Sequence, residues 1–192
     1  AEKPVTEWTS GDLTVTVGSV FQNPRSQFVN SEVEAELAFG CENQGLSREE
    51  IVGRIHESVR VFGIEELLHR RVEELSGGQR QMVILASVYA TDPDIFVLDE
   101  PTAALDVAAA ATVLDWLAEL AGGPGAVPGV VPAAPAQKPA TVLMVTHDAA
   151  AAARAQHVLV MDAGLLVASP PGGDPAAVSD AVLSARGAGG SR

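Results

Sequence analysis

Two adjacent carboxylates, Asp99 and Glu100, follow directly on an apolar run at residues 95–98. Four apolar residues without polar alternation are typical of a parallel strand that is covered on both faces. Open α/β sheets bind their ligands at the carboxyl ends of such strands. We therefore expect Asp99 to hold Mg²⁺ and Glu100 to act as a general base on an attacking water. The alternative is a solvated strand end, which is common for an isolated Asp-Glu pair.

A second candidate site is the segment 75–79, which reads Leu-Ser-Gly-Gly-Gln at the start of a predicted helix. Two consecutive glycines let backbone N–H groups approach an anion closely, and the positive end of the helix dipole favours a phosphate there. The serine hydroxyl adds one more donor. The alternative is an ordinary helix start that binds no ligand. The four candidate phosphate-binding residues are Ser76, Gly77, Gly78 and Gln79.

Three weaker signals occur in order along the chain. Gln22 follows the first predicted strand, Asp106 lies shortly after the two carboxylates, and His147 comes after the last apolar strand. Taken singly, a glutamine at a strand end usually contacts solvent and a histidine there is usually structural. Their specificity comes from their order relative to the carboxylates and the Ser-Gly-Gly segment.

Hydrophobic periodicity predicts the elements that must position these residues. Residues 13–18 alternate between apolar and polar types, which predicts a strand with one buried face. The apolar runs at 95–98 and 141–145 predict two buried strands, and residues 113–120 between them have helical spacing. This alternation of strands and helices predicts an α/β fold.

Residues 25–74 have helical spacing throughout and are predicted to be all-helical. Two pairs in this range have capping-box spacing and one glycine marks a helix end; they are Ser31 with Glu34, Ser47 with Glu50, and Gly63. Residues 122–140 consist almost wholly of Gly, Pro, Ala and Val, which predicts a flexible insertion. The Gly-rich end, residues 185–192, predicts a disordered tail.

Composition excludes several classes of function. The formal net charge is −13, and because binding to DNA or RNA depends on Lys and Arg that neutralise phosphates, nucleic acid is not expected as a partner. Cys41 is the only cysteine, which excludes an internal disulfide and a zinc site with several cysteines. The sequence has no membrane-length apolar stretch and no secretory signal. We expect a soluble or peripheral protein in a reducing cytoplasm.

Taken together and in this order, the motifs resemble those of the nucleotide-binding domain of ABC transporters. The matches are Gln22 to the Q-loop, residues 75–79 to the LSGGQ signature, Asp99 and Glu100 to the Walker B pair, Asp106 to the D-loop, and His147 to the switch histidine. The resemblance covers roughly residues 11–170. It implies a P-loop NTPase core, formed by residues 1–24 and 75–184, with an inserted α-helical subdomain at 25–74.

The resemblance also implies cofactors and partners. Two such domains sandwich ATP and Mg²⁺ head to tail, so that Asp99, Glu100 and His147 of one domain face the signature of the other. Gln22 contributes to the Mg²⁺ site and to catalysis, and Asp106 contributes to nucleotide binding. The implied partners are a second ABC ATPase domain, identical or different, and an integral membrane transporter subunit.

Within that family the chain most resembles the ATPase subunits of energy-coupling factor importers, which take up vitamins or transition-metal ions. The residues that carry this resemblance are Phe-Gln-Asn-Pro at 21–24, Gln27, Phe28, and the stretch 33–40. It implies ATP hydrolysis at the cytoplasmic face of the cell membrane, coupled to uptake. Phe28 and the helix from Ser31 are candidates for lining the groove that meets the membrane subunit.

The chain departs from the family pattern at one motif. The P-loop pattern G-x-x-x-x-G-K-[ST] needs a Gly-Lys pair, and the two lysines, Lys3 and Lys138, both precede proline. We interpret this as a truncated gene, a split domain or a fragment, in which the first strands and the P-loop are missing and the chain alone is inactive. We expect the missing segment to supply the central strand, which leaves Val97 and Val142 with an unpaired neighbour.

A second hypothesis is a non-catalytic partner that lends its signature to a competent ATPase. Glu100 and His147 argue against it, since a subunit that only lends its signature needs neither. A third class, the soluble ABC proteins of DNA repair or translation, is disfavoured by the negative charge and by the short helical segment.

Overall fold

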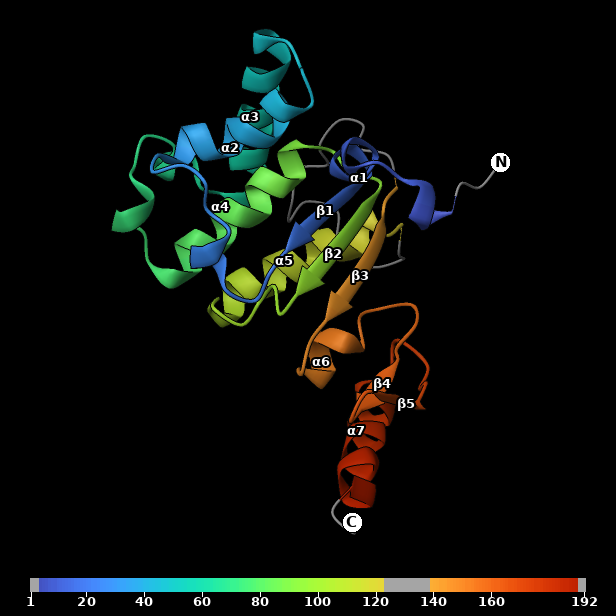
Figure 1. Cartoon of the computed structure of the whole chain (residues 1–192). Helices are drawn as coiled ribbons and strands as arrows, with labels where there is room; N and C mark the ends of the chain where they lie inside the picture. Colours follow the sequence, from blue (N-terminus) through green and yellow to red (C-terminus); the bar gives the residue numbers. More distant parts are fainter. Residues whose placement is uncertain (1–3, 123–138, 190–192) are drawn as a thin grey trace. The chain divides into compact units, whose positions relative to one another are not determined.

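The first part of the chain contains a three-stranded sheet. Its strands are β1 (Val17–Val20), β2 (Ile95–Asp99) and β3 (Thr141–Val145). β2 lies between the other two, and it pairs with β1 in parallel so that Val20 is opposite Leu98. Figure 1 shows the three strands running in the same direction. The residues that follow β1 and β2 therefore lie at the same edge of the sheet, in the α/β arrangement that the sequence predicts.

The computed structural model describes residues 4–122 and 139–189, which form two units, Ala1–Met144 and Val145–Arg192. Most of the insertion predicted at 122–140 lies outside the described residues. Among the described helices, none is both long and apolar enough to span a membrane.

The first predicted strand is mostly wrong. Residues Ser10–Thr16 form helix α1, and the strand begins only at Val17. The cause is a capping box: Thr9 Oγ1 accepts a hydrogen bond from the N–H of Asp12 at 3.1 Å, and the Asp12 carboxylate accepts one from the N–H of Thr9 at 2.8 Å. These two bonds satisfy amides that a helix start would otherwise leave unpaired, and they outweigh a short alternation of apolar residues.

The burial of the strands also differs from the expectation. β2 buries Phe96 and Leu98 almost completely while the intervening side chains are half-buried, and β3 leaves Leu143 and Val145 each 56% exposed. An apolar run shows that a strand is hydrophobic but not how many layers cover it. The expected gap beside Val97 is wrong as well, because β2 has a neighbouring strand on both sides.

Helices α2 (Val33–Asn43), α3 (Arg48–Phe62) and α4 (Gly77–Ala90) pack against one another beside the sheet (Figure 1). Four short 3₁₀ turns accompany the helices of this first unit: Val5–Glu7, Pro24–Ser26, Glu65–Leu67 and Val72–Glu74. The Ser47–Glu50 capping box is confirmed, and Gly63 ends α3 in the left-handed region at φ 61°.

The capping box predicted at Ser31 is wrong, because α2 begins one residue later with Glu32 as an N-cap that accepts no side-chain hydrogen bond. The chain at this point is extended instead. The carbonyl of Ser31 accepts from the N–H of Val72 at 2.9 Å, and the N–H of Val33 donates to the carbonyl of Arg70 at 3.1 Å. This pairing joins the start of α2 to the segment that precedes α4.

Aromatic side chains join the helices to the sheet. The four rings come from α3, α4, β2 and α5 (Val107–Leu120): Phe62, Tyr89, Phe96 and Trp116. Trp116 meets each of the other three edge-on, with ring centroids 4.9–5.8 Å apart. Such pairs add roughly 0.5–1.5 kcal/mol each beyond burial of their area, so this cluster fixes the helical part against β2.

The second unit has its own small core. It contains α6 (Ala149–Ala152), the antiparallel hairpin β4 (Val160–Asp162) with β5 (Leu165–Ala168), and α7 (Pro175–Gly189). Val158 and Val178 are buried between these elements. Because α7 continues to Gly189, residues 185–189 form helix rather than the predicted disordered tail; the last three residues lie outside the described part.

Candidate functional site

The two carboxylates lie where β2 ends. Asp99 is the last residue of the strand, and Glu100 turns the chain with a φ of 50°, in the left-handed region that a residue with a side chain rarely adopts. The carbonyl of Glu100 accepts a hydrogen bond from the N–H of Ala103 at 3.2 Å, which closes the turn. Both carboxylates are partly exposed. They can therefore reach a ligand at the carboxyl edge of the sheet.

Gln22 follows β1 at the same edge and is exposed. The backbone beside it is held by another glutamine: Gln27 Nε2 donates to the carbonyl of Ser19 at 2.6 Å, and Gln27 Oε1 accepts from the N–H of Phe21 at 3.0 Å. The structure thus brings Gln22 and the two carboxylates to one sheet edge, as the sequence order predicts. Gln27 belongs to this site as a support, a role that its sequence position alone does not reveal.

The chemistry of these side chains fits Mg²⁺. A carboxylate and an amide oxygen are hard ligands of the kind that Mg²⁺ prefers, with water and phosphate oxygens completing its octahedron. Within the residues that the structure describes, no group of three or more His, Cys, Asp or Glu could hold a metal ion alone.

Ser76 begins helix α4 through a reciprocal capping box. Its Oγ accepts from the N–H of Gln79 at 3.2 Å, and the side-chain oxygen of Gln79 accepts from the N–H of Ser76 at 2.9 Å. Ser76 and Gly77 are both exposed. This 14-residue helix therefore presents its positive end to solvent, which is the geometry for anion binding that the sequence predicts.

The two glycines of this segment serve different purposes. A Cβ added to Gly78 would lie 3.1 Å from the carbonyl oxygen of Ala104 and 3.7 Å from a methyl of Leu105, so Gly78 is needed for close packing of the turn after β2. A Cβ added to Gly77 would meet no atom within 4 Å in the described part of the chain. Among the described residues, packing therefore restricts position 78 but not position 77.

Alanine at each glycine should separate these purposes. We expect Gly77→Ala to leave the free energy of unfolding unchanged or slightly raised, because alanine is the better helix former by about 1 kcal/mol. Gly78→Ala should lower that free energy by about 1–3 kcal/mol through overpacking against Ala104. Urea unfolding of the two variants beside the unsubstituted chain measures both changes. Equal stability of the two variants would show that the turn moves aside freely.

Arg80 is a supporting residue that the sequence reasoning missed. Its guanidinium donates to the carbonyls of Val72 at 3.2 Å and Glu73 at 3.1 Å. These bonds hold the segment before Ser76 against α4. Because both acceptors are backbone atoms, no sequence motif signals the contact.

Asp106 caps α5, and its Oδ1 accepts from the N–H of Ala109 at 2.9 Å. His147 lies in the second unit, two residues beyond β3, and is exposed. The neighbouring Asp148 caps α6 by accepting from the amides of Ala150 and Ala151. That His147 faces the signature of a second domain, as Asp99 and Glu100 are expected to do, stays a prediction.

Comparison with known proteins places these motifs in a family. The family model for "ABC transporter" matches residues 1–103. The energy-coupling factor transporter ATP-binding protein EcfA1 of Bacillus licheniformis is 39% identical over 160 residues, covering 83% of this chain and 52% of that protein. The protein of the same name from Enterococcus faecalis is 38% identical, over 85% of this chain and 54% of that protein. The chain therefore spans about half the length of these curated relatives.

Solved structures agree on the fold. The structure of cbiO1 from Clostridium perfringens, described as part of the ABC transporter complex cbiONQ, is 28% identical with a TM-score of 0.67 and covers 88% of this chain and 61% of that one. The ATP-binding cassette MJ0796, solved as a dimer with ADP and Pi, is 22% identical with a TM-score of 0.70, covering 86% of this chain and 68% of that one. With its motifs in the family order on this fold, the chain belongs to the ABC transporter family, in its ATP-binding domain.

Proposed function

We propose that this chain is the catalytic part of an ATP-hydrolysing subunit of an energy-coupling factor importer, which couples ATP hydrolysis to uptake of a vitamin or a metal ion. The observation that carries the proposal is the shared sheet edge of Gln22, Asp99 and Glu100. The names of the relatives from Bacillus licheniformis and Enterococcus faecalis support the importer class.

Each residue of the site has a part in the proposed reaction. Asp99 and Gln22 would hold Mg²⁺, and the ion would supply positive charge against the phosphates of ATP. Glu100 accepts a proton from the attacking water, and His147, the residue that matches the family's switch histidine, is a further catalytic candidate. The exposed helix start with Ser76, Gly77, Gly78 and Gln79 binds the nucleotide of a second ATPase domain, and Asp106 lies at the interface between the two domains.

A membrane subunit is the second proposed partner. We assign its contact to Phe28 and α2 in the helical part, which places the protein peripherally at the cytoplasmic face of the cell membrane. The exposed apolar side chain of Val29, 64% exposed, is adjacent in sequence and supports this assignment. The alternative function, a non-catalytic subunit that lends its signature, is disfavoured because Glu100 is held in a strained turn at the site, which a lending subunit does not need.

The test uses a version of the chain extended at its N-terminus by a P-loop segment from an ABC ATPase of this family, called here the extended protein. We expect Gly77→Asp in the extended protein to lower ATP hydrolysis at least a hundredfold, because a carboxylate at the helix start repels the partner's γ-phosphate. Phosphate release at saturating Mg-ATP measures the rate.

Gly53→Asp is the matched control. Gly53 is an exposed glycine within α3, and a Cβ there also meets no atom within 4 Å in the described part of the chain. The control should hydrolyse ATP at close to the unsubstituted rate. Hydrolysis by Gly77→Asp at the control rate would refute the proposed role of the helix start.

A further inference from the structure

Glu36 is a buried carboxylate that no catalytic role explains. Its side chain on α2 is only 5% exposed, and Oε2 accepts hydrogen bonds from the backbone N–H of Val29 at 3.0 Å, from that of Asn30 at 2.8 Å and from Asn30 Nδ2 at 3.3 Å. A charge inside a protein is costly unless it is fully hydrogen-bonded. The Glu36 carboxylate accepts these hydrogen bonds from two consecutive residues, Val29 and Asn30.

That segment connects the catalytic edge of the sheet to the helical part. It begins after Gln22, and Gln27 ties its first half to the end of β1 through Ser19 and Phe21. Glu36 ties its second half to α2. The connecting segment, residues 23–30, is therefore anchored at one end to the end of β1, which Gln22 follows, and at the other end to α2.

The same end of α2 is joined to the signature segment. The backbone pairing of Ser31 with Val72 lies just beyond the Glu36 anchor, and Arg80 holds Val72 against α4. A displacement at Gln22 can thus reach α2 and the helix that begins at Ser76 through the backbone of residues 22–31 together with these hydrogen bonds. Without the Glu36 anchor, one hydrogen bond still joins the segment to α2, from Asn30 Nδ2 to the carbonyl of Ala35 at 3.4 Å, so Glu36 supplies most of this connection.

We propose that Glu36 is a positioning residue that makes the segment after Gln22 move together with α2, so that nucleotide-driven motion reaches the membrane subunit. The proposal rests on the proposed function. Glu36 touches neither nucleotide nor metal in it. Phe39, which is 36% exposed, lies one turn along α2 from Glu36 on the same helix face, and Val29 is held directly by the anchor. Glu36 therefore fixes both apolar side chains relative to each other.

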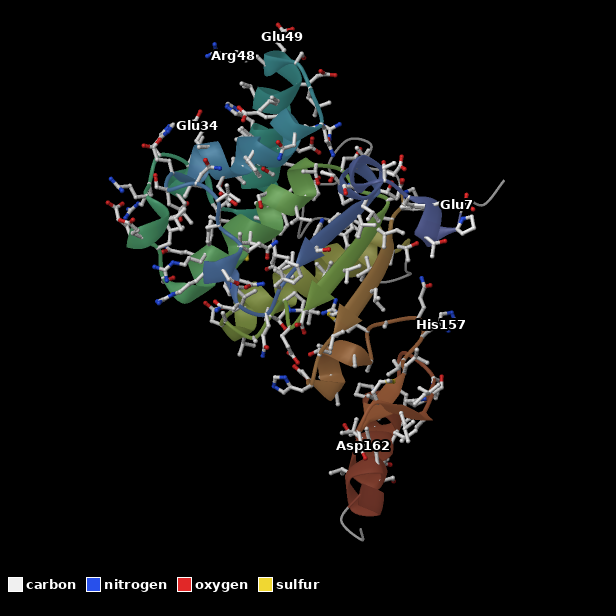
Figure 2. The ribbon with its side chains drawn as sticks, viewed as in Figure 1. Glu7, Glu34, Arg48, Glu49, His157 and Asp162 are labelled. Atoms are coloured by element: carbon white, nitrogen blue, oxygen red, sulfur yellow. The ribbon has the colours of Figure 1, made fainter. Side chains whose placement is uncertain are left out.

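The first experiment measures amide hydrogen exchange in the full 192-residue chain. Glu36→Ala should speed exchange at the amides of Val29 and Asn30 at least tenfold, while Glu36→Gln, which keeps one acceptor oxygen, should retain most of the protection. Glu34→Ala is the matched control, because Glu34 projects outward from the same helix (Figure 2) and its carboxylate lies 3.4 Å from the Nδ1 of the exposed His69. Unchanged exchange in Glu36→Ala would overturn the proposal.

The second experiment separates coupling from folding. The extended protein is assembled with the membrane subunits of an energy-coupling factor transporter in lipid vesicles, and solute uptake is measured per ATP hydrolysed. Glu36→Ala should lower this ratio about fivefold with hydrolysis within twofold of normal, and Glu36→Gln should restore most of it. An unchanged ratio, or a parallel loss of hydrolysis and uptake, would overturn the role of Glu36. Absence of ATP-driven uptake without any substitution would instead overturn the proposed function, and this inference with it.

Discussion

Replacing Glu100 by Gln in the extended protein should lower ATP hydrolysis about a thousandfold while Mg-ATP stays bound. A positioned general base contributes roughly 10²–10⁴-fold to the rate, and glutamine keeps the size of the side chain without accepting the proton. Contacts to the phosphates do not depend on Glu100, so the ATP-bound dimer should accumulate. Phosphate release gives the rate, and size-exclusion chromatography with Mg-ATP gives the dimer.

Asp94→Asn is the control for this substitution. Asp94 immediately precedes β2, so the same carboxylate-to-amide change is made at the opposite end of the strand from Glu100. The control should hydrolyse ATP at close to the unsubstituted rate. If Glu100→Gln also hydrolysed at that rate, another group would have to be the base.

The 192-residue chain without extension should bind no Mg-ATP at micromolar concentration and release no phosphate. The charge of the triphosphate would meet Asp99 and Glu100, and the sequence offers no P-loop lysine and no cradle of loop amides to offset it. Mg²⁺ offsets only part of this repulsion. The exposed helix start at Ser76 serves the nucleotide of a partner domain in the proposed arrangement, so it does not replace the missing contacts.

Isothermal titration of the chain with Mg-ATP measures the binding, and the extended protein under the same conditions is the control. Circular dichroism before the titration verifies that the chain is folded. Micromolar binding by the unextended chain would reveal a phosphate site that the present assignment does not contain.

Local chemistry made much of the fold predictable. The hydroxyl and carboxyl groups of Ser47 and Glu50 begin α3 with only neighbouring atoms as partners, and Ser76 begins α4 in the same way. The apolar strands β2 and β3 were predicted for a similar reason, since their runs are too short and too β-branched for helices. The common edge of Gln22 and Asp99 then follows from the parallel direction of β1 and β2.

Several errors arise where distant residues decide the outcome, whereas helix α1 was missed although its capping box of Thr9 and Asp12 is local. Ser31 lies in a capping-box pattern, yet Val72, far along the chain, pairs with its backbone and keeps it extended. The exposure of Leu143 depends on which layers cover β3, and no spacing in the sequence encodes that. The site supports Gln27 and Arg80, and the anchor Glu36 outside the site, were missed because they bind backbone atoms, which every residue type possesses.

The left-handed turn at Glu100 shows that the fold and the proposed catalysis place different demands on this position. Adopting such a φ costs a residue with a side chain about 1–2 kcal/mol. Glycine would avoid this strain, but its greater conformational entropy in the unfolded chain would offset the gain in stability. The fold alone would therefore accept glycine here about as well as glutamate. Stability therefore does not require a glutamate at this position, whereas the proposed role of general base does.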